Sequence, residues 1–510
     1  MVQYIYKKAG GTILKYISTR SDEAVSAEEA LLLGLAKDGG LYLPDQLPKP
    51  FIDFDQIKDF SYAELATFIL APFLPDIPVE DLRSLVQKAY EDTFDTDEIV
   101  PVKRITEAFS VAEMFHGRTC AFKDLALSLF PYLLVWAKGK NKKIKKVLIL
   151  TATSGDTGKA ALEGFRDVPG VDIMVFYPSE GVSPLQKDQM QKQVGHNVSV
   201  VGIDGHFDDA QSALKEIFNS SLRSEMEEKG IYFSSANSIN IGRLLPQIVY
   251  YAWIWLKAVK NHSIEKNEPF NVVVPTGNFG NILSAWLAKQ IGVPVGKLIC
   301  ASNENKILAD FFATGVYDMH RPFHVTESPS MDILISSNFE RFLSYVVCDK
   351  KQIVKDMKDL KETGVYSISP EALKRAIGEI TGEWASPNEM EEAIRRMYDD
   401  YDYLIDPHTA VAYAVYHKLR RRGEIPRHTH TVIIATAHPY KFPFAMAEAL
   451  GMKSEGTPYD VLRQLEKKTN VTIPSALGAL EEKEKRFTKT ISKDEVESVV
   501  EFYAKQLLER

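Results

Sequence analysis

The sequence has few cysteines and no long apolar segment. Three cysteines occur among 510 residues, Cys120, Cys300 and Cys348, and they are far apart without metal-ligand spacing. Such an odd and sparse set is typical of a reducing compartment. No apolar run approaches the roughly 20 residues that a membrane helix needs. The first residues show neither a signal-peptide core nor a transit-peptide pattern. We therefore expect a cytoplasmic protein.

Several familiar catalytic patterns are also missing. The sequence contains no CxxC, HExxH or GxSxG pattern, so metal-dependent and serine-hydrolase chemistry have no starting point, and we expect no metal. Residues 151–159 lie between a strand-like and a helix-like segment, as a nucleotide P-loop would. They fail the P-loop pattern twice, because Thr153 stands where the first glycine belongs and Ala160 follows the lysine. The loop is either an anion or carboxylate cradle of another kind or a polar turn that caps the helix.

The charge balance excludes a further group of functions. The formal net charge is −8, with 45% hydrophobic and 25% charged residues. This composition is ordinary for a globular protein, and it disfavours a general role on nucleic acids or on membrane surfaces. The short basic run at 138–143 is typical of a solvated linker. The length predicts several domains or subdomains.

Apolar periodicity divides the chain into two main parts. Residues 1–98 are mainly helical, and Ser26 with Glu29 forms a capping-box pattern. From residue 99 to 510, continuous apolar strands alternate with helices, which favours a parallel α/β sheet. We predict strands at 145–151, 171–177, 198–203, 231–234, 271–275, 297–301 and 431–436, with one helix spanning 207–229 and another spanning 244–259. A charged segment at about 348–401 interrupts the rhythm and is interpreted as a helical insertion.

Two further loops follow predicted strands and have the composition of binding sites. Residues 275–281 contain Gly277 and Gly280, which permit positive φ and a close backbone approach, and N–H groups at the following helix start could hold a phosphate. Residues 234–243 offer hydroxyls, amides and Arg243, which could clamp a phosphate or could be a surface arginine. At the end of the last strand, the hydroxyl of Thr436 could bond a heterocycle nitrogen. His438 is either a general base or a packed capping group.

Lys123 is the candidate reactive group that these loops could serve. It lies between a polar segment, 113–122, and an apolar helical run, which places it near a helix start. Desolvation and the positive end of a helix would both lower the pKa of its amine. Such an amine is a nucleophile suited to a Schiff base with an aldehyde. Taken alone, a surface lysine paired with Asp124 is the commoner arrangement.

Six segments together resemble the threonine synthase family, and the resemblance covers nearly the whole chain. They are residues 38–44 (DGGLYLP), His116–Gly117 with residues 121–124 (AFKD), residues 153–158 (TSGDTG), residues 277–281 (GNFGN), residues 406–410 (DPHTA) and residues 436–439 (TAHP). The long N-terminal part and the inserted helices resemble the branch found in fungi and many bacteria. Arg118 departs from the pattern, where many members have proline.

The resemblance implies a pyridoxal-5'-phosphate-dependent enzyme of fold type II, similar to the tryptophan synthase β subunit. Two parallel-sheet subdomains, an N-terminal mainly helical domain and a helical insertion are then expected. Lys123 would form the Schiff base and move protons, and Thr436 would face the pyridine nitrogen. The residues implied to hold the cofactor phosphate are Gly277, Asn278, Phe279, Gly280 and Asn281. Those implied to bind substrate are Ser154, Gly155, Asp156, Thr157, Gly158, Ser183, Asn237, Ser238, Asn240 and Arg243.

The implied reaction converts O-phospho-L-homoserine and water into L-threonine and phosphate, the last step of threonine biosynthesis, in a monomer or homodimer. The enzyme class would be a carbon–oxygen lyase acting on phosphates. Two alternatives stay open at this point: a threonine-synthase-like phospho-lyase that eliminates phosphate without making threonine, and a non-catalytic binding protein on the same fold.

Overall fold

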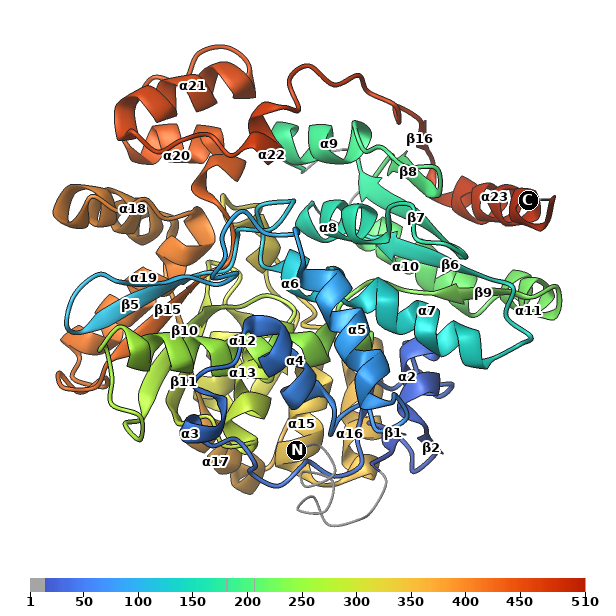
Figure 1. Cartoon of the computed structure of the whole chain (residues 1–510), viewed down its shortest axis with the longest axis horizontal. Helices are drawn as coiled ribbons and strands as arrows, with labels where there is room; N and C mark the ends of the chain where they lie inside the picture. The colour runs from blue at the N-terminus through green and yellow to red at the C-terminus, as the bar shows by residue number, and fades with distance from the viewer. Residues whose placement is uncertain (1–13, 154, 180–181, 206, 510) are drawn as a thin grey trace.

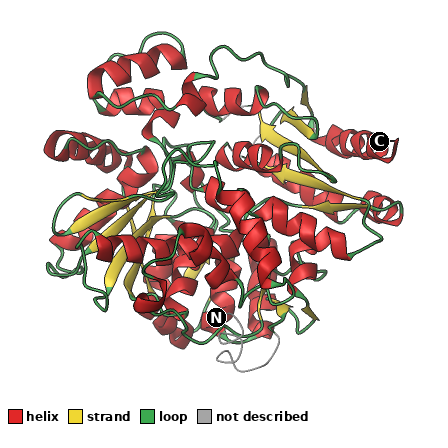
Figure 2. Ribbon diagram, viewed as in Figure 1, coloured by secondary structure: helices red, strands yellow, loops and turns green. Residues whose placement is uncertain are grey.

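The computed structural model describes residues 14–153, 155–179, 182–205 and 207–509. Two sheets dominate it, one on each side of the view in Figure 1. Helices flank both groups of strands (Figure 2), as expected for sheets whose strands are apolar along their whole length. No helix of the described chain is long and apolar enough to cross a membrane. The architecture confirms the predicted pair of parallel-sheet units.

The larger sheet has six strands in the order β14-β11-β10-β15-β5-β4. All neighbours are parallel except β4 and β5. Every residue of β5, β10 and β15 is buried, which explains the unbroken apolar runs in the sequence. In chain order the strands are β4 (Val102–Arg104), β5 (Phe109–Glu113), β10 (Phe270–Pro275), β11 (Val295–Ser302), β14 (Ile380–Trp384) and β15 (Thr431–Ala435).

The smaller sheet has five parallel strands in the order β16-β8-β7-β6-β9. Its strands are β6 (Lys146–Ala152), β7 (Val171–Pro178), β8 (Val198–Ile203), β9 (Ile231–Ser234) and β16 (Thr490–Ile491). Its helices are α8 (Asp156–Phe165), α9 (Pro184–Gln191), α10 (Phe207–Phe218), α11 (Ser221–Glu228) and α23 (Val496–Glu509). The single helix predicted over 207–229 is wrong. The chain forms α10 and α11, and Ser220 between them is the N-cap of α11 in an extended conformation.

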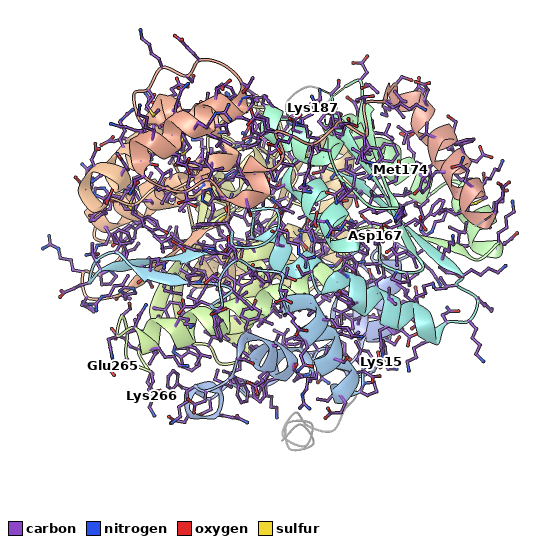
Figure 3. All side chains as sticks on the ribbon, turned by 45° about the horizontal axis from the view of Figure 1, so that its top comes forward. Lys15, Asp167, Met174, Lys187, Glu265 and Lys266 are labelled. Atoms are coloured by element: carbon purple, nitrogen blue, oxygen red, sulfur yellow. The ribbon has the colours of Figure 1, made fainter. Side chains whose placement is uncertain are left out.

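The N-terminal part combines helices with a small antiparallel sheet, β2-β1-β3. Its elements are β1 (Tyr16–Ser18), β2 (Ala24–Val25), α2 (Ala27–Leu33), β3 (Tyr42–Pro44), α3 (Phe54–Ile57), α4 (Tyr62–Leu70) and α5 (Val79–Tyr90). The capping box of Ser26 and Glu29 is confirmed at the start of α2. This part is joined to the larger unit near Lys266 (labelled in Figure 3), whose Nζ lies 2.7 Å from Asp55 Oδ2 in α3.

A long buried helix, α12 (Ile241–Lys260), runs through the middle of the molecule (Figure 1). It packs against helices of the N-terminal part and of both units, namely α2, α4, α6, α7 and α13. Three of these helices are α6 (Lys123–Leu127), α7 (Phe130–Lys140) and α13 (Gly280–Gln290). Helix α14 (Ile307–Thr314) packs against the larger sheet at β11 and β14. Because α12 touches so many elements, its first turn is placed firmly between the two sheets.

The segment at 348–401 contains strands as well as the expected helices. It holds α16 (Lys350–Thr363), β13 (Val365–Ser367), α17 (Pro370–Glu379), β14 and α18 (Pro387–Tyr401), preceded by β12 (Val316–Asp318), η1 (Pro329–Met331) and α15 (Phe339–Val347). Strand β14 pairs with β11, so the segment supplies the edge of the larger sheet. The chain continues through α19 (Pro407–Arg421), η2 (Pro439–Lys441), α20 (Pro443–Ala449), α21 (Pro458–Thr469), α22 (Ser475–Gly478) and η3 (Lys493–Glu495).

Candidate active site

Lys123 is the first residue of α6, which confirms the expected helix start. The preceding turn is held by Asp124, whose carboxylate accepts hydrogen bonds from the N–H of Thr119 at 2.8 Å and from its hydroxyl at 2.7 Å. Phe122 N–H also donates to Thr436 O at 2.8 Å, which ties the lysine segment to the end of β15. The position of the lysine therefore depends on both local capping and a contact with the distant end of the chain.

The amine of Lys123 is buried in a cavity, with 8% of the residue exposed. Its Nζ lies 3.4 Å from Asp156 Oδ2 and 3.3 Å from Ser330 Oγ. Burial lowers the pKa of Lys123, and the nearby cations of Lys441 and Arg243 lower it further, while Asp156 opposes them. Burial is the largest of these effects. A readily deprotonated amine is available here for covalent chemistry.

Asp156 is the counter-ion of two lysines. Its Oδ1 lies 2.6 Å from Lys441 Nζ and accepts from Gln186 Nε2 at 2.8 Å. Burial would raise the pKa of Asp156, but Lys441 and Lys123 outweigh burial and hold it well below its usual range. Asp156 is therefore ionised and anchors the amine of Lys123 by charge.

The loop of residues 277–281 forms another wall of the cavity. An added Cβ at Gly277 would lie 2.3 Å from Ser330 O, so close backbone approach requires glycine there. Neither Gly277 nor Gly280 has a positive φ, and the left-handed residue of the loop is Phe279, at φ 63°. No N–H group of residues 277–281 has an acceptor within the described chain. These free donors at the start of α13 can hold a phosphate.

Arg243 supplies another part of the cavity wall, from the first turn of α12. It is 3% exposed, and its Nη1 donates to Ala236 O at 2.8 Å. Its Nε has no hydrogen-bond partner, and no carboxylate of the described residues forms an ion pair with it. Burial lowers the pKa of Arg243 to about 10. A buried charge without a counter-ion is costly, so an anion bound in the cavity beside Arg243 would be stabilised.

The cavity lies where strands from both sheets end. Asn237 and Ser238 follow β9, Thr157 follows β6, and Thr436 follows β15. The structure thus brings together twelve of the residues predicted from the sequence. Asp156 contacts Lys123, and the other eleven line the cavity: Lys123, Thr157, Asn237, Ser238, Arg243, Gly277, Asn278, Phe279, Gly280, Asn281 and Thr436. Ligand sites at the carboxyl ends of parallel strands are the general arrangement in such folds.

Other residues proposed from the sequence lie away from the cavity lining. Gly155 is the N-cap of α8 and Gly158 lies in its first turn, and their N–H groups donate to Thr153 Oγ1. Ser183 is the N-cap of α9. Asn240 is the N-cap of α12, and both ends of its amide are engaged. Ser154 lies outside the described residues.

His438 has a structural environment. Its Nδ1 accepts the N–H of Tyr440 at 3.2 Å, and burial lowers its pKa to about 4. It does not line the cavity. Of the two interpretations, the capping role is the one that the structure supports. Cys120 is likewise a packed thiol, since burial raises its pKa to about 12.

Sequence reasoning missed a wall made by residues 329–333 together with His408 and Gln247. The His408 ring accepts the N–H of Ser330 at Nε2, 3.1 Å away, and its Nδ1 lies 2.8 Å from Asp406 Oδ1. This arrangement holds Ser330 beside Lys123. The sequence of 406–410 resembles a family segment, but it contains no signal that predicts contact with residue 330.

His116, at the start of the lysine segment, lies between two carboxylates. Its Nδ1 is 2.6 Å from Asp95 Oδ1 and its Nε2 is 2.9 Å from Glu113 Oε2. Tyr403 donates to Glu113, and the charge of His116 also acts on His438. Burial would lower the pKa of His116, but the two carboxylates raise it to about 9. The imidazolium is therefore stabilised by folding.

We expect the free energy of unfolding to fall as pH rises through about 9. The folded pKa of His116 is about 9 and the ordinary value is 6.5, so the stabilisation is complete below pH 6.5 and is lost towards pH 9. The difference between the two pKa values corresponds to about 3 kcal/mol, and solvent screening at this partly exposed site reduces it to about 2 kcal/mol. Urea unfolding at several pH values measures it. His116→Gln should remove this part of the pH dependence, whereas exposed His428→Gln should keep it; equal profiles for all three proteins would contradict the assignment.

The site fits pyridoxal phosphate. A buried amine can bond an aldehyde, the free N–H groups of 277–281 can bond a phosphate, and Thr436 presents a hydroxyl whose position is set by its own backbone bond to Phe122. The amide Nδ2 of Asn281 is also buried without a partner, next to the same loop. The lysine and the loop line the same cavity, so both could hold one cofactor molecule.

Comparisons with known proteins agree with this geometry. Residues 99–437 match the family model "Pyridoxal-phosphate dependent enzyme", residues 15–90 match "Threonine synthase N terminus", and residues 409–502 match "Threonine synthase, C-terminal". A threonine synthase of Schizosaccharomyces pombe is 36% identical over 87% of this chain and 90% of its own length.

Two further comparisons concern a structure and a longer relative. The crystal structure of a threonine synthase from Brucella melitensis with bound PLP superimposes with a TM-score of 0.83 at 34% identity, covering 97% of this chain and 99% of that one. The human protein "Threonine synthase-like 1" is 37% identical over 86% of this chain. This chain spans 61% of the length of that relative.

Fold and site together define a pyridoxal-phosphate-dependent enzyme of fold type II. Within that class, the chain belongs to the threonine synthase family.

Proposed function

We propose that the enzyme converts O-phospho-L-homoserine and water into L-threonine and phosphate, as a carbon–oxygen lyase acting on phosphates. One observation carries the proposal: a single cavity has two walls whose groups suit anions. The first is the loop 277–281 with its free N–H groups, and the second is Arg243 with Ser238. The cofactor phosphate needs one such wall, and a phosphorylated substrate needs the other.

The bound cofactor would supply an electron sink for charge that develops on the substrate carbons. Lys123 would hold it covalently, the loop 277–281 would hold its phosphate, and Thr436 would face its ring nitrogen. Thr436 is a neutral hydroxyl, so it would not force protonation of the ring. The cavity wall at Thr157 is the place we assign to the substrate carboxylate.

Lys123 also has the surroundings of a general base. Burial lowers its pKa, which favours the free amine that can take a proton. Asp156 and Ser330 hold the amine in place through contacts of 3.4 and 3.3 Å. We propose that it moves protons between the substrate carbons while phosphate leaves.

We assign the substrate phosphate to Arg243, Ser238 and Asn237. Arg243 offers an unpartnered Nε, and Ser238 Oγ lies 3.0 Å from Ser337 Oγ, so its hydroxyl is held at the cavity wall. Asn240 and Ser183 act as helix caps, and a direct contact of either with substrate stays a prediction.

The test is an assay of both products from O-phospho-L-homoserine. We expect equal amounts of threonine and phosphate from the cofactor-loaded protein. Release of phosphate without threonine would replace the proposal with a phospho-lyase that does not add water. Release of neither product, in protein whose cofactor absorbance band is lost on borohydride treatment, would mean that the substrate is wrong.

Compartment and assembly are also proposals. We propose a cytoplasmic enzyme on the support of three unpaired cysteines, two of them buried. Whether it is a monomer or a homodimer stays a prediction, and a sedimentation measurement decides it.

A further inference from the structure

Arg341, in the first turn of α15, is one of the largest fully buried side chains of the described structure, with 1% exposed. It does not line the active-site cavity. Its Nε donates to Tyr42 O at 2.8 Å, its Nη2 donates to Ile239 O at 2.5 Å, and its Nη1 donates to Asn338 Oδ1. One planar guanidinium thus joins three segments that are far apart in the sequence.

Each partner of Arg341 leads to a different part of the molecule. Tyr42 belongs to β3 of the N-terminal part. Ile239 lies between Ser238, which lines the cavity, and Asn240, which caps the helix carrying Arg243. The wall proposed for the substrate phosphate is therefore attached to the N-terminal part through Arg341.

Asn338 extends the connection to the other wall. Because its Oδ1 accepts from Arg341, its Nδ2 must point the other way, where it donates to Asn278 O at 3.0 Å. The N–H of Asn338 donates to the same oxygen, also at 3.0 Å. Both lone pairs of the Asn278 carbonyl are thus occupied, which orients the peptide that carries the next N–H of the loop.

Neighbouring contacts connect the same regions independently. Asn240 Nδ2 donates to Leu31 O at 3.1 Å, at the end of α2. Glu340, next to Arg341, accepts from Arg20 Nε at 2.8 Å and from Thr19 Oγ1 at 2.5 Å. The carboxylate of Glu340 is engaged by these N-terminal residues, so the hydrogen bonds of Arg341 go to neutral oxygens.

We infer that Arg341 is a positioning residue that couples the N-terminal part to both phosphate-facing walls of the cavity. The N-terminal part then contributes to ligand binding without touching the ligand. For the wall that faces the substrate phosphate, the inference rests on the proposed function. For the wall that faces the cofactor phosphate, it needs only the family to which the chain belongs.

The physical reason is the fixed shape of the guanidinium. A lysine could keep the charge but could not span three acceptors in one plane. A methionine would fill a similar volume and remove a buried charge, which need not destabilise the fold. Loss of positioning can therefore be separated from loss of folding.

The experiment compares Arg341→Met and Arg341→Lys with a matched variant, Arg20→Met. Arg20→Met breaks an N-terminal contact with α15 but leaves Asn338 and Ile239 untouched. For both Arg341 variants we expect about a tenfold weaker cofactor affinity, a tenfold higher KM for O-phospho-L-homoserine, and a kcat within about threefold of wild type. Arg20→Met should lower the unfolding temperature and leave both binding constants within about twofold of wild type.

Three outcomes decide the inference. Binding constants of the Arg341 variants equal to those of Arg20→Met would overturn it. If Arg341→Met does not fold, Asn338→Ala replaces it and should show the same tenfold loss of cofactor affinity; unchanged affinity there would overturn the cofactor half. If wild type makes no threonine, the substrate is wrong, and the affinities for cofactor and for inorganic phosphate still test both walls.

Discussion

Replacement of Lys123 with alanine is expected to abolish turnover and the visible absorbance band of the bound cofactor. The amine is the nucleophilic group in the cavity that is held beside Ser330 and Asp156. The substitution removes both the covalent attachment and the proposed base, and either change alone would lower the reaction rate strongly. We expect threonine formation to fall by at least about 1000-fold.

The measurement combines a spectrum, borohydride treatment and the product assay. Lys159→Met is the matched control, because Lys159 is also a buried lysine but its Nζ bonds Glu163 and Gln193 instead of facing the cavity. This control should keep the band, even if its stability is lower. Turnover that survives in Lys123→Ala would show that another residue carries the chemistry.

Replacement of Arg243 with methionine is expected to lower activity strongly without lowering stability. The guanidinium is buried without a carboxylate, and burial lowers its pKa to about 10. Keeping it charged costs the folded state on the order of 3 kcal/mol. Methionine removes this cost, so the unfolding temperature of the protein without ligand should rise or stay unchanged.

The same substitution should lower kcat/KM for O-phospho-L-homoserine by roughly 100- to 1000-fold, the usual consequence of losing a charged partner of a phosphate. Cofactor affinity should change little, because the loop 277–281 does not contact Arg243 through any hydrogen bond found in the described residues. Arg243→Lys should recover part of the loss. A variant with normal kcat/KM would place the substrate phosphate elsewhere.

Much of the fold follows from local patterns. Strands β8 and β9 begin and end where the apolar runs predict, and the N-cap and N3 residues of α2 have the expected roles. Strand β5 and the short strand β4 were not assigned from the sequence. Both lie near the strong helical signal around Lys123. Strand β5 pairs with β15, which is more than 300 residues away, and β4 pairs with β5.

The site residues likewise divide into those that local sequence indicates and those that only the tertiary structure brings together. The loop 277–281 and the first turn of α12 are continuous segments, so their composition indicates a ligand. The pair of Asp156 and Lys441, and the bond from Ser330 to His408, join residues that only the tertiary structure brings together. The break at Ser220 shows the limit in the other direction, since a continuous amphipathic pattern does not exclude two helices.

The position of β15 between β10 and β5 constrains the order of events during synthesis on the ribosome. Strands β4 and β5 leave the ribosome early, but their place in the larger sheet is created only when residues 431–435 appear. Until then the edges of β5 and β10 are open, a state prone to association with other chains. The Lys123 segment waits for the same event, because Phe122 bonds Thr436. The nascent chain is therefore expected to acquire its cofactor only after nearly complete translation.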